Sequence, residues 1–180
     1  MKVRTLDISS FDEACRRLEQ AIGHDGFRPD VVVGIESGGR FVAEKIFVDV
    51  PHAYVAVRRP STSSKKGVVR SAISHLPIWI CDILRIAEAR LLNARKPSPS
   101  SFEGELPKSL CGQDNILIVD DAVDSGVTMQ AVYDAVRSAC PSASVKTAAI
   151  TVTTSRPLIV PDISLYNQLI RFPWSMDAHN

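Results

Sequence analysis

The stretch ILIVDDAVDSGVT, from Ile116 to Thr128, decides the fold of this chain. Its four leading apolar residues predict a buried strand of a parallel sheet, because such strands are covered on both faces. Two carboxylates, Asp120 and Asp121, follow directly, and a short polar loop then closes on Ser125-Gly-x-Thr. Beyond the loop, apolar residues recur at helical spacing. The stretch therefore predicts a strand, a polar turn and a helix.

Each part of this stretch suits a phosphorylated sugar. Asp120 and Asp121 come at the C-terminal edge of a parallel sheet, where α/β proteins bind ligands. Their oxygens are suited to sugar hydroxyls or to Mg²⁺. The turn from Asp124 to Thr128 brings backbone N–H groups and two hydroxyls to a helix N-terminus, which favours phosphate. Together these features predict a site for a ribose phosphate.

Residue types and spacing exclude two other classes of binding motif. The stretch has no Gly-Lys-Ser or Gly-Lys-Thr sequence, so it is not a P-loop. An EF-hand needs acids at alternate positions and a glycine at the sixth, and neither is present. A further alternative, in which the aspartates merely cap the helix, stays open.

Length and composition indicate one globular domain. The 180 residues are enough to bury a sizeable core, and a net charge of +1 predicts no strong affinity for nucleic acid or membrane. The first residues lack the apolar core of a signal peptide, and no apolar run reaches the roughly 20 residues of a membrane span. The cysteines, at positions 15, 81, 111 and 140, include no Cys-x-x-Cys pair. We therefore expect reduced thiols, no zinc site and a cytoplasmic protein.

The Ile116–Thr128 stretch resembles the phosphoribosyl-diphosphate (PRPP) signature of type I phosphoribosyltransferases. This resemblance implies an α/β fold with a mostly parallel five-stranded sheet, flanked by helices, and a small hood from the chain termini. It also implies Mg²⁺-dependent transfer of the 5-phosphoribosyl group from PRPP to a nucleobase, with release of pyrophosphate. The implied partners are PRPP and a base, with a purine as the expected acceptor.

The resemblance assigns roles within the stretch. Asp120 and Asp121 would face the ribose hydroxyls, directly or through Mg²⁺. Asp124 stands where purine enzymes place an acid that manages the proton on N7 of the base, which makes it the catalytic candidate. A helix N-cap is the alternative for Asp124, and both roles can coexist. The residues expected to wrap the 5′-phosphate are Ser125, Gly126, Val127 and Thr128.

A second strand and turn precede this stretch. Val31–Ile35 predicts a buried strand, and a helix with Phe41, Val42, Ile46 and Phe47 on its apolar side follows the turn. The turn resembles the pyrophosphate loop of the family, in which one peptide bond is often cis without proline. The residues expected to receive pyrophosphate are Ser37, Gly38 and Gly39.

Purine-salvage relatives commonly carry Arg or Lys where this chain has Ser37. Two alternatives follow for the missing cation. Either Arg40 supplies it, or backbone groups and a metal hold the pyrophosphate alone.

The remaining segments complete the domain. Ser10 and Glu13 form a capping box, which predicts a helix from about Ser10 to Ile22. Ala53 to Arg58 predicts a strand. The resemblance implies one phosphoribosyltransferase domain, 1–180, with an insertion at about 59–113 relative to the smallest family members.

The insertion contains two different segments. Residues 59–70 are basic and without periodicity, which is typical of a solvated loop; in the family, the same place holds a mobile loop that closes over PRPP. Lys65, Lys66 and Arg70 would then screen the leaving diphosphate. Residues 73–94 predict a helix whose apolar residues spread beyond one stripe. This pattern indicates either a subunit interface, consistent with a homodimer, or burial within the monomer.

The tail resembles the end of bacterial and archaeal purine phosphoribosyltransferases. After a predicted strand at 145–152, it contains a Pro-Asp step and finishes on Phe-Pro-Trp at 172–174. Two departures concern the base pocket. Thr153 or Thr154 stands where the purine enzymes place a Lys for the 6-oxo group, and Leu169 stands where they place a stacking aromatic. The base-binding candidates are accordingly Thr154, Leu169 and Ile170.

These departures leave three hypotheses for the function. The first is a purine-type nucleobase phosphoribosyltransferase. The second is a phosphoribosyltransferase for a different acceptor. The third is a regulator that senses PRPP or a nucleotide on the same fold without turnover.

Overall fold

The computed structural model describes residues 3–57, 82, 86–87 and 106–175. The elements follow one another as β1 (Val3–Thr5), α1 (Ile8–His24), β2 (Val31–Ile35), α2 (Gly38–Ala43), β3 (His52–Val55), the 3₁₀ turn η1 (Lys108–Leu110), β4 (Asn115–Val123), α5 (Val127–Ala139), β5 (Ser144–Val152), β6 (Ile163–Tyr166) and β7 (Leu169–Arg171).

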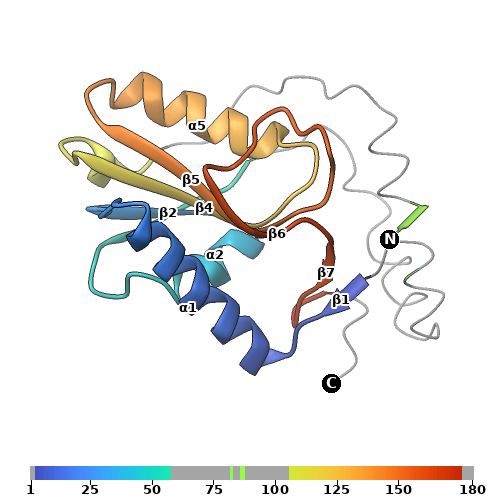
Figure 1. Cartoon of the computed structure of the whole chain (residues 1–180). Helices are drawn as coiled ribbons and strands as arrows, with labels where there is room; N and C mark the ends of the chain where they lie inside the picture. The colour runs from blue at the N-terminus through green and yellow to red at the C-terminus, as the bar shows by residue number, and fades with distance from the viewer. Residues whose placement is uncertain (1–2, 58–81, 83–85, 88–105, 176–180) are drawn as a thin grey trace.

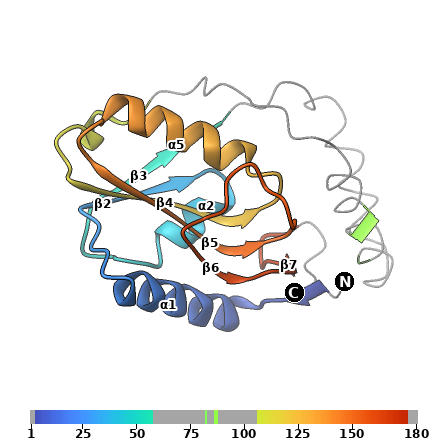
Figure 2. The same ribbon diagram turned by 45° about the horizontal axis from the view of Figure 1, so that its top comes forward.

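Five strands form the central sheet in the order β3-β2-β4-β5-β6, and every pair is parallel (Figure 2). The prediction of a parallel five-stranded sheet is therefore confirmed. The apolar run Ile116–Val119 forms the middle of β4, and all five residues of β2 are buried. Such continuous burial requires cover on both faces of the sheet.

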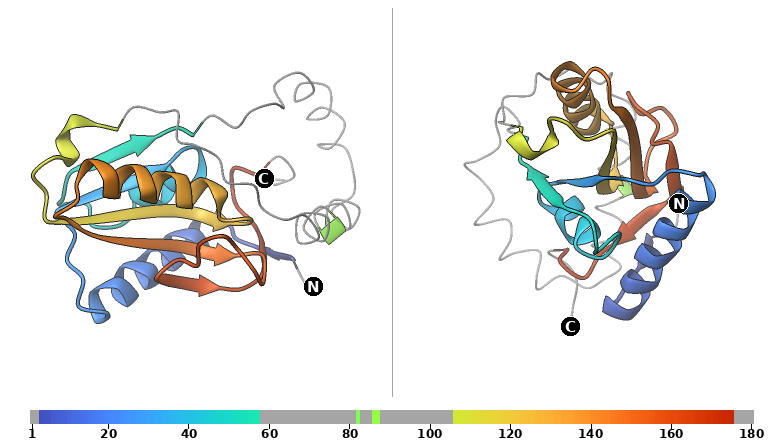
Figure 3. Two further views of the ribbon diagram at one scale, coloured as in Figure 1. Left: turned by 90° about the horizontal axis from the view of Figure 1, so that it is seen from above. Right: turned by 90° about the vertical axis from the view of Figure 1, so that its left-hand side faces the viewer.

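Helices provide this cover, so the domain has three layers (Figures 1 and 3). α5 lies on one face, where Met129, Val132 and Val136 join the buried side chains of β2 and β4. α1 and α2 lie on the opposite face, over a second apolar cluster that contains Leu18 and Val42.

The two ends of the described chain meet in a separate small sheet. β1 pairs in parallel with β7, with Val3 opposite Leu169 and Thr5 opposite Arg171. The buried Arg171 guanidinium donates to Thr5 Oγ1 (2.9 Å) and to Asp82 Oδ1 (2.6 Å). This small sheet corresponds to the predicted hood.

Two helix predictions need correction. α1 is capped by Asp7, whose Oδ1 accepts from the Ser10 N–H at 2.8 Å, so the capping box predicted at Ser10 is wrong. Asp7 is favoured because its short carboxylate reaches the free N–H groups of the first turn. α2 ends at Ala43, and Ile46 and Phe47 lie beyond it.

Strand boundaries also differ from the sequence prediction. β3 runs from His52 to Val55 and so ends before Arg58. β4 continues through both carboxylates to Val123, because backbone pairing with β5 extends as far as Val152. The acid pair is therefore part of the strand itself.

Several predicted segments lie outside the described residues. They are the basic loop 59–70 with Lys65, Lys66 and Arg70, and most of the helix predicted at 73–94, of which only Asp82, Ile86 and Ala87 are described, all helical. Among the described cysteines, Cys15, Cys111 and Cys140 are free thiols. Within the described ranges, no helix has the length and apolarity needed to cross a membrane.

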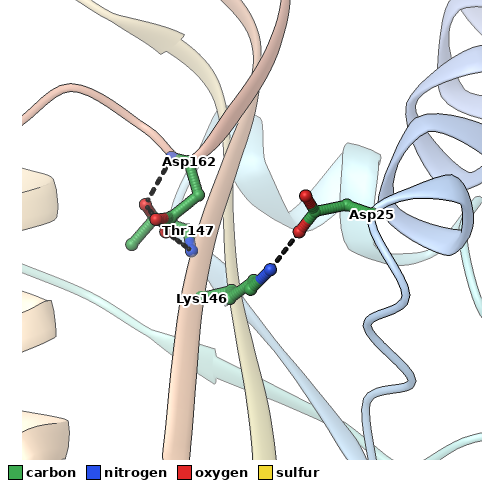
Figure 4. Close-up of polar contacts among 4 residues, drawn as sticks. All are labelled: Asp25, Lys146, Thr147 and Asp162. Atoms are coloured by element: carbon green, nitrogen blue, oxygen red, sulfur yellow. Dashed lines mark hydrogen bonds and ion pairs between the residues drawn. The ribbon is translucent and has the colours of Figure 1, made fainter.

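Side chains on both sides of β5 make polar contacts close to the start of this strand (Figure 4). Asp162, of the Pro-Asp step, accepts from the Thr147 N–H at 2.7 Å and from its hydroxyl at 2.8 Å. Lys146 points the opposite way, as strand alternation requires, and pairs with Asp25 behind α1. Asp162 therefore fixes where β6 begins beside β5.

The two contacts in Figure 4 should differ in energy. Asp162→Ala leaves the N–H and hydroxyl of the buried Thr147 without their acceptor, so we expect it to lower the free energy of unfolding by about 1–3 kcal/mol. Asp25→Ala removes a partly exposed ion pair and should cost under about 1 kcal/mol. Urea unfolding of both variants measures the difference. Equal losses would contradict the role given to Asp162.

Candidate active site

The candidate site lies where the strand order reverses. The chain runs from β2 to β3 on one side and from β4 through β5 to β6 on the other, so the switch point falls between β2 and β4. Gly34 of β2 stands opposite Val119 of β4. Beyond this pair β2 ends at Ile35, while β4 continues beside β5 to Val123. The two strands therefore separate at the position where open α/β sheets bind ligands.

The turn after β2 fits tightly against the acids of β4. A Cβ atom at Gly38 would lie 2.1–2.2 Å from the carboxylate atoms of Asp121. At Gly39 it would lie 2.5 Å from the Val119 carbonyl and 2.9 Å from the Asp120 Cα. Only glycine fits at both positions. The peptide bond between Glu36 and Ser37 is cis, as expected for this loop, and Ser37 is exposed.

The two carboxylates of β4 are held by specific hydrogen bonds. Asp120 Oδ1 accepts from the Asp121 N–H at 2.9 Å. Asp121 Oδ1 accepts from the Ala122 N–H at 2.9 Å, and its Oδ2 accepts from the Trp174 indole at 3.3 Å. Trp174 comes from the C-terminal tail, so the site includes a residue that the sequence reasoning had not assigned to it.

Burial changes the acidity of this pair. Desolvation raises the pKa of Asp120 well above its ordinary value, and the charge of Asp121 raises it further. Desolvation also raises the pKa of Asp121, against hydrogen bonds that favour its charged form. Two adjacent, partly buried carboxylates repel each other, and a cation or the hydroxyls of a sugar would relieve this repulsion.

The turn after β4 is built for an anion. Gly126, at φ 76°, occupies the N-cap position of α5, and no side chain caps the helix there. A Cβ at Gly126 would lie 2.8 Å from the Ile159 N, so close packing also requires glycine. α5 begins at Val127, directly after this turn, and the N-terminus of a helix is a position that favours phosphate.

Asp124 does not cap α5, since Gly126 holds that position. The exposed Asp124 instead accepts a hydrogen bond at Oδ1 from the Thr153 hydroxyl. The Thr153 N–H donates to the Val123 carbonyl at 2.9 Å, which places the two residues on neighbouring strand ends. The alternative interpretation of Asp124 as an N-cap is therefore wrong, and its side chain points to the segment that was predicted to contact the base.

A cavity of about 540 Å³ lies beside this contact. Its lining is uncharged and rich in hydroxyl and amide groups: Val152, Thr153, Thr154, Ser155, Pro157, Val160, Ser164 and Asn167. Thr154 thus lines the cavity. Leu169 and Ile170 do not line it but are buried in β7, with Ile170 in the apolar cluster under α1. No sequence pattern predicts Ser164 or Asn167 at this site, because their positions depend on where β6 begins and ends.

The residues present fit a magnesium ion bound together with substrate. No group of three or more His, Cys, Asp or Glu side chains that could hold a metal occurs within the described ranges. Mg²⁺ is usually held by one or two carboxylates together with substrate phosphates, and Asp120 and Asp121 offer such a pair. The donor set is therefore sufficient only with a phosphorylated ligand.

Sheet order, glycine turn, acid pair and helix N-terminus are features with which α/β proteins bind phosphorylated ligands at a switch point. The family model of the phosphoribosyl transferase domain matches residues 6–176 of this chain. The chain belongs to this family.

Solved structures agree in fold. A xanthine-guanine-hypoxanthine phosphoribosyltransferase of Helicobacter pylori has a TM-score of 0.68 at 15% identity, covering 96% of this chain and 94% of its own. A purine phosphoribosyltransferase of Pyrococcus horikoshii has a TM-score of 0.64 at 22% identity, covering 97% and 95%. A Neisseria gonorrhoeae protein solved with ppGpp bound has a TM-score of 0.62 at 16% identity, covering 97% and 90%. No curated protein sequence matches significantly.

The close approach of the glycine turn to the acids is testable. Gly38→Ala must displace the Asp121 carboxylate, so we expect a loss of about 1–3 kcal/mol in the free energy of unfolding, as for other overpacked sites. Gly23→Ala, within α1, meets no atom within 4 Å and should be neutral or stabilising. Thermal and urea unfolding compare the two variants. A Gly38→Ala protein as stable as wild type would refute the contact.

Proposed function

We propose that this protein transfers the 5-phosphoribosyl group of PRPP to a nucleobase of purine type and releases pyrophosphate. One observation carries the proposal: the Gly38–Gly39 turn lies directly against the acid pair of β4, the strand whose following turn begins α5. A pyrophosphate site, a ribose site and a phosphate site would then adjoin, in the order in which these groups occur in PRPP.

Each part of PRPP has a proposed partner. Asp120 and Asp121 bind the ribose hydroxyls, residues 125–128 bind the 5′-phosphate, and residues 37–39 bind the pyrophosphate. Loss of pyrophosphate builds positive charge on the ribose ring, so the nearby carboxylates stabilise the transition state electrostatically. Bound Mg²⁺, held by Asp120 and Asp121, would neutralise charge on the diphosphate and so make it a better leaving group.

The missing cation at Ser37 has two possible substitutes. The Arg40 guanidinium is engaged by Glu44 at 2.8 Å and lies 4.8 Å from the centre of the Tyr54 ring. These contacts favour the alternative in which backbone N–H groups and a metal hold the pyrophosphate. We therefore propose that Arg40 has no direct part in binding it.

Asp124 is the proposed catalytic residue. It would take or hold the proton on N7 of the base, while the Thr153 hydroxyl fixes its orientation. The base itself would lie by Thr154, in the cavity beside Asp124. Leu169 and Ile170, which are buried and do not line this cavity, are not proposed to contact it. With hydroxyls in place of a Lys, the site can both donate to and accept from the ring edge.

A second candidate is a sensor of PRPP or a nucleotide without turnover. A specific observation supports it: the acid at Asp124 is paired with a neutral hydroxyl where active purine relatives supply Lys. The Neisseria gonorrhoeae protein of similar fold was solved with ppGpp. A transferase for a heterocycle other than a purine is a third candidate, and the same assay separates all three.

The deciding assay measures pyrophosphate release from PRPP and Mg²⁺ with hypoxanthine, guanine, xanthine and adenine. We expect base-dependent release that EDTA abolishes. Discrimination between guanine and adenine in kcat/KM should stay well below the roughly 10⁴-fold of sites built to hydrogen-bond one substrate group. Bound PRPP without release for any base, with competition by ppGpp, would favour the sensor. Efficient use of guanine with adenine excluded would show that a residue other than Thr154 reads the 6-position.

Asp124→Asn separates catalysis from binding. Amide replacement removes the proton acceptor, so transfer should slow by roughly a hundredfold or more. PRPP affinity should stay near wild type, because the phosphate turn and acid pair are unchanged. Asp134→Asn is the matched control, since Asp134 lies on α5 and bonds only to Gln130 among the contacts described for it. Steady-state kinetics check both variants, and wild-type transfer by Asp124→Asn would remove Asp124 from the mechanism.

A further inference from the structure

Trp174, near the end of the described chain, is enclosed by three aromatic rings from separate segments. It stacks on Phe41 of α2, with ring centres 4.5 Å apart and planes inclined by 28°. It also stacks on Phe172, with ring centres 5.0 Å apart and planes inclined by 10°. The ring of Phe11, in α1, is perpendicular to the indole, and the ring centres lie 4.9 Å apart. Contacts from three directions fix the plane of the indole, and with it the direction of the N–H group.

That direction is toward the acid pair. The indole Nε1–H donates to Asp121 Oδ2 at 3.3 Å, while the Ala122 N–H holds the other oxygen, Oδ1, at 2.9 Å. Gly38 closes the remaining side, because a Cβ there would overlap the carboxylate. The Asp121 carboxylate is therefore fixed on three sides, and only one of the three is a side chain.

Packing alone does not require tryptophan at this position. Phenylalanine would preserve the stacking, but it has no N–H to donate, and tryptophan is the aromatic residue whose ring carries only a donor. Phe41 also follows the Gly38–Gly39 turn by two residues. The indole thus contacts the acid pair of the proposed PRPP site directly. It also contacts Phe41 of α2, the helix that begins at the proposed pyrophosphate turn.

We propose that Trp174 is a positioning residue of the active site, which orients Asp121 for the ribose and makes the C-terminal tail responsive to PRPP. Only the kinetic test of this proposal rests on the proposed function. The hydrogen bond itself is a property of the free protein and is tested without ligand.

The ligand-free test uses the indole N–H signals in ¹H–¹⁵N NMR spectra. The chain has two tryptophans, so two indole signals are expected, and the one absent from Trp174→Phe belongs to Trp174. Asp121→Asn should shift this signal upfield, because a neutral amide oxygen is a weaker acceptor than a carboxylate. Asp134→Asn, on the outer helix α5, should leave it unchanged. An unshifted Trp174 signal in Asp121→Asn would overturn the proposal, whatever the protein does with PRPP.

The kinetic test compares Trp174→Phe with Phe11→Leu. Loss of the donor to a charged acceptor should raise KM for PRPP by about tenfold or more and leave KM for the base unchanged. Phe11→Leu removes one ring contact but keeps the donor, so it should lower the melting temperature without changing KM for PRPP. Wild-type KM for PRPP in Trp174→Phe would show that the ring only packs.

The wild-type protein provides an independent check if Trp174→Phe does not fold. Added PRPP with Mg²⁺ should shift the Trp174 indole signal with a saturable dependence on concentration. PRPP that binds by calorimetry without moving this signal would contradict the proposal. Absence of both binding and turnover would instead refute the proposed function and leave the ligand-free NMR result to decide the hydrogen bond.

Discussion

The site depends on one steric constraint, the contact between the backbone at Gly38 and Gly39 and the end of β4. A side chain at either position would overlap Asp121 or the Val119 carbonyl. The contact is possible because β2 and β4 are neighbours in the sheet while their following segments diverge at the switch point. Because glycine has no Cβ atom, the turn after β2 can lie directly against the end of β4, some eighty residues later in the sequence.

This contact has an electrostatic consequence. Desolvation raises the pKa of both Asp120 and Asp121, so the site holds two carboxylates in an environment that disfavours their charge. Hydrogen bonds from backbone N–H groups and from Trp174 partly offset this cost. A ligand that brings a cation and hydroxyl donors would offset the rest. Binding of a metal–sugar phosphate complex at this acid pair would therefore stabilise the folded protein.

The sequence was informative where local pattern and chemistry coincide. Buried runs in β2 and β4 are continuous and apolar, so strand type and parallel pairing could be predicted. Boundaries that depend on tertiary contacts could not: α2 is short because the chain turns at Glu44, and Asp7 caps α1 ahead of Ser10. The Trp174–Asp121 contact joins residues 53 positions apart, and no periodicity encodes such a pair. Local patterns predict elements, whereas packing of the tail determines which side chains complete the site.

The most direct test of this account is a calorimetric titration of the wild-type chain with PRPP in the presence of Mg²⁺. The account predicts saturable binding of one PRPP per chain. Binding should weaken when EDTA removes the metal, because Mg²⁺ is held jointly by protein carboxylates and substrate phosphates. No heat of binding at millimolar PRPP with Mg²⁺ would contradict the central claim that the glycine turn and the acid pair of β4 form a phosphoribosyl site.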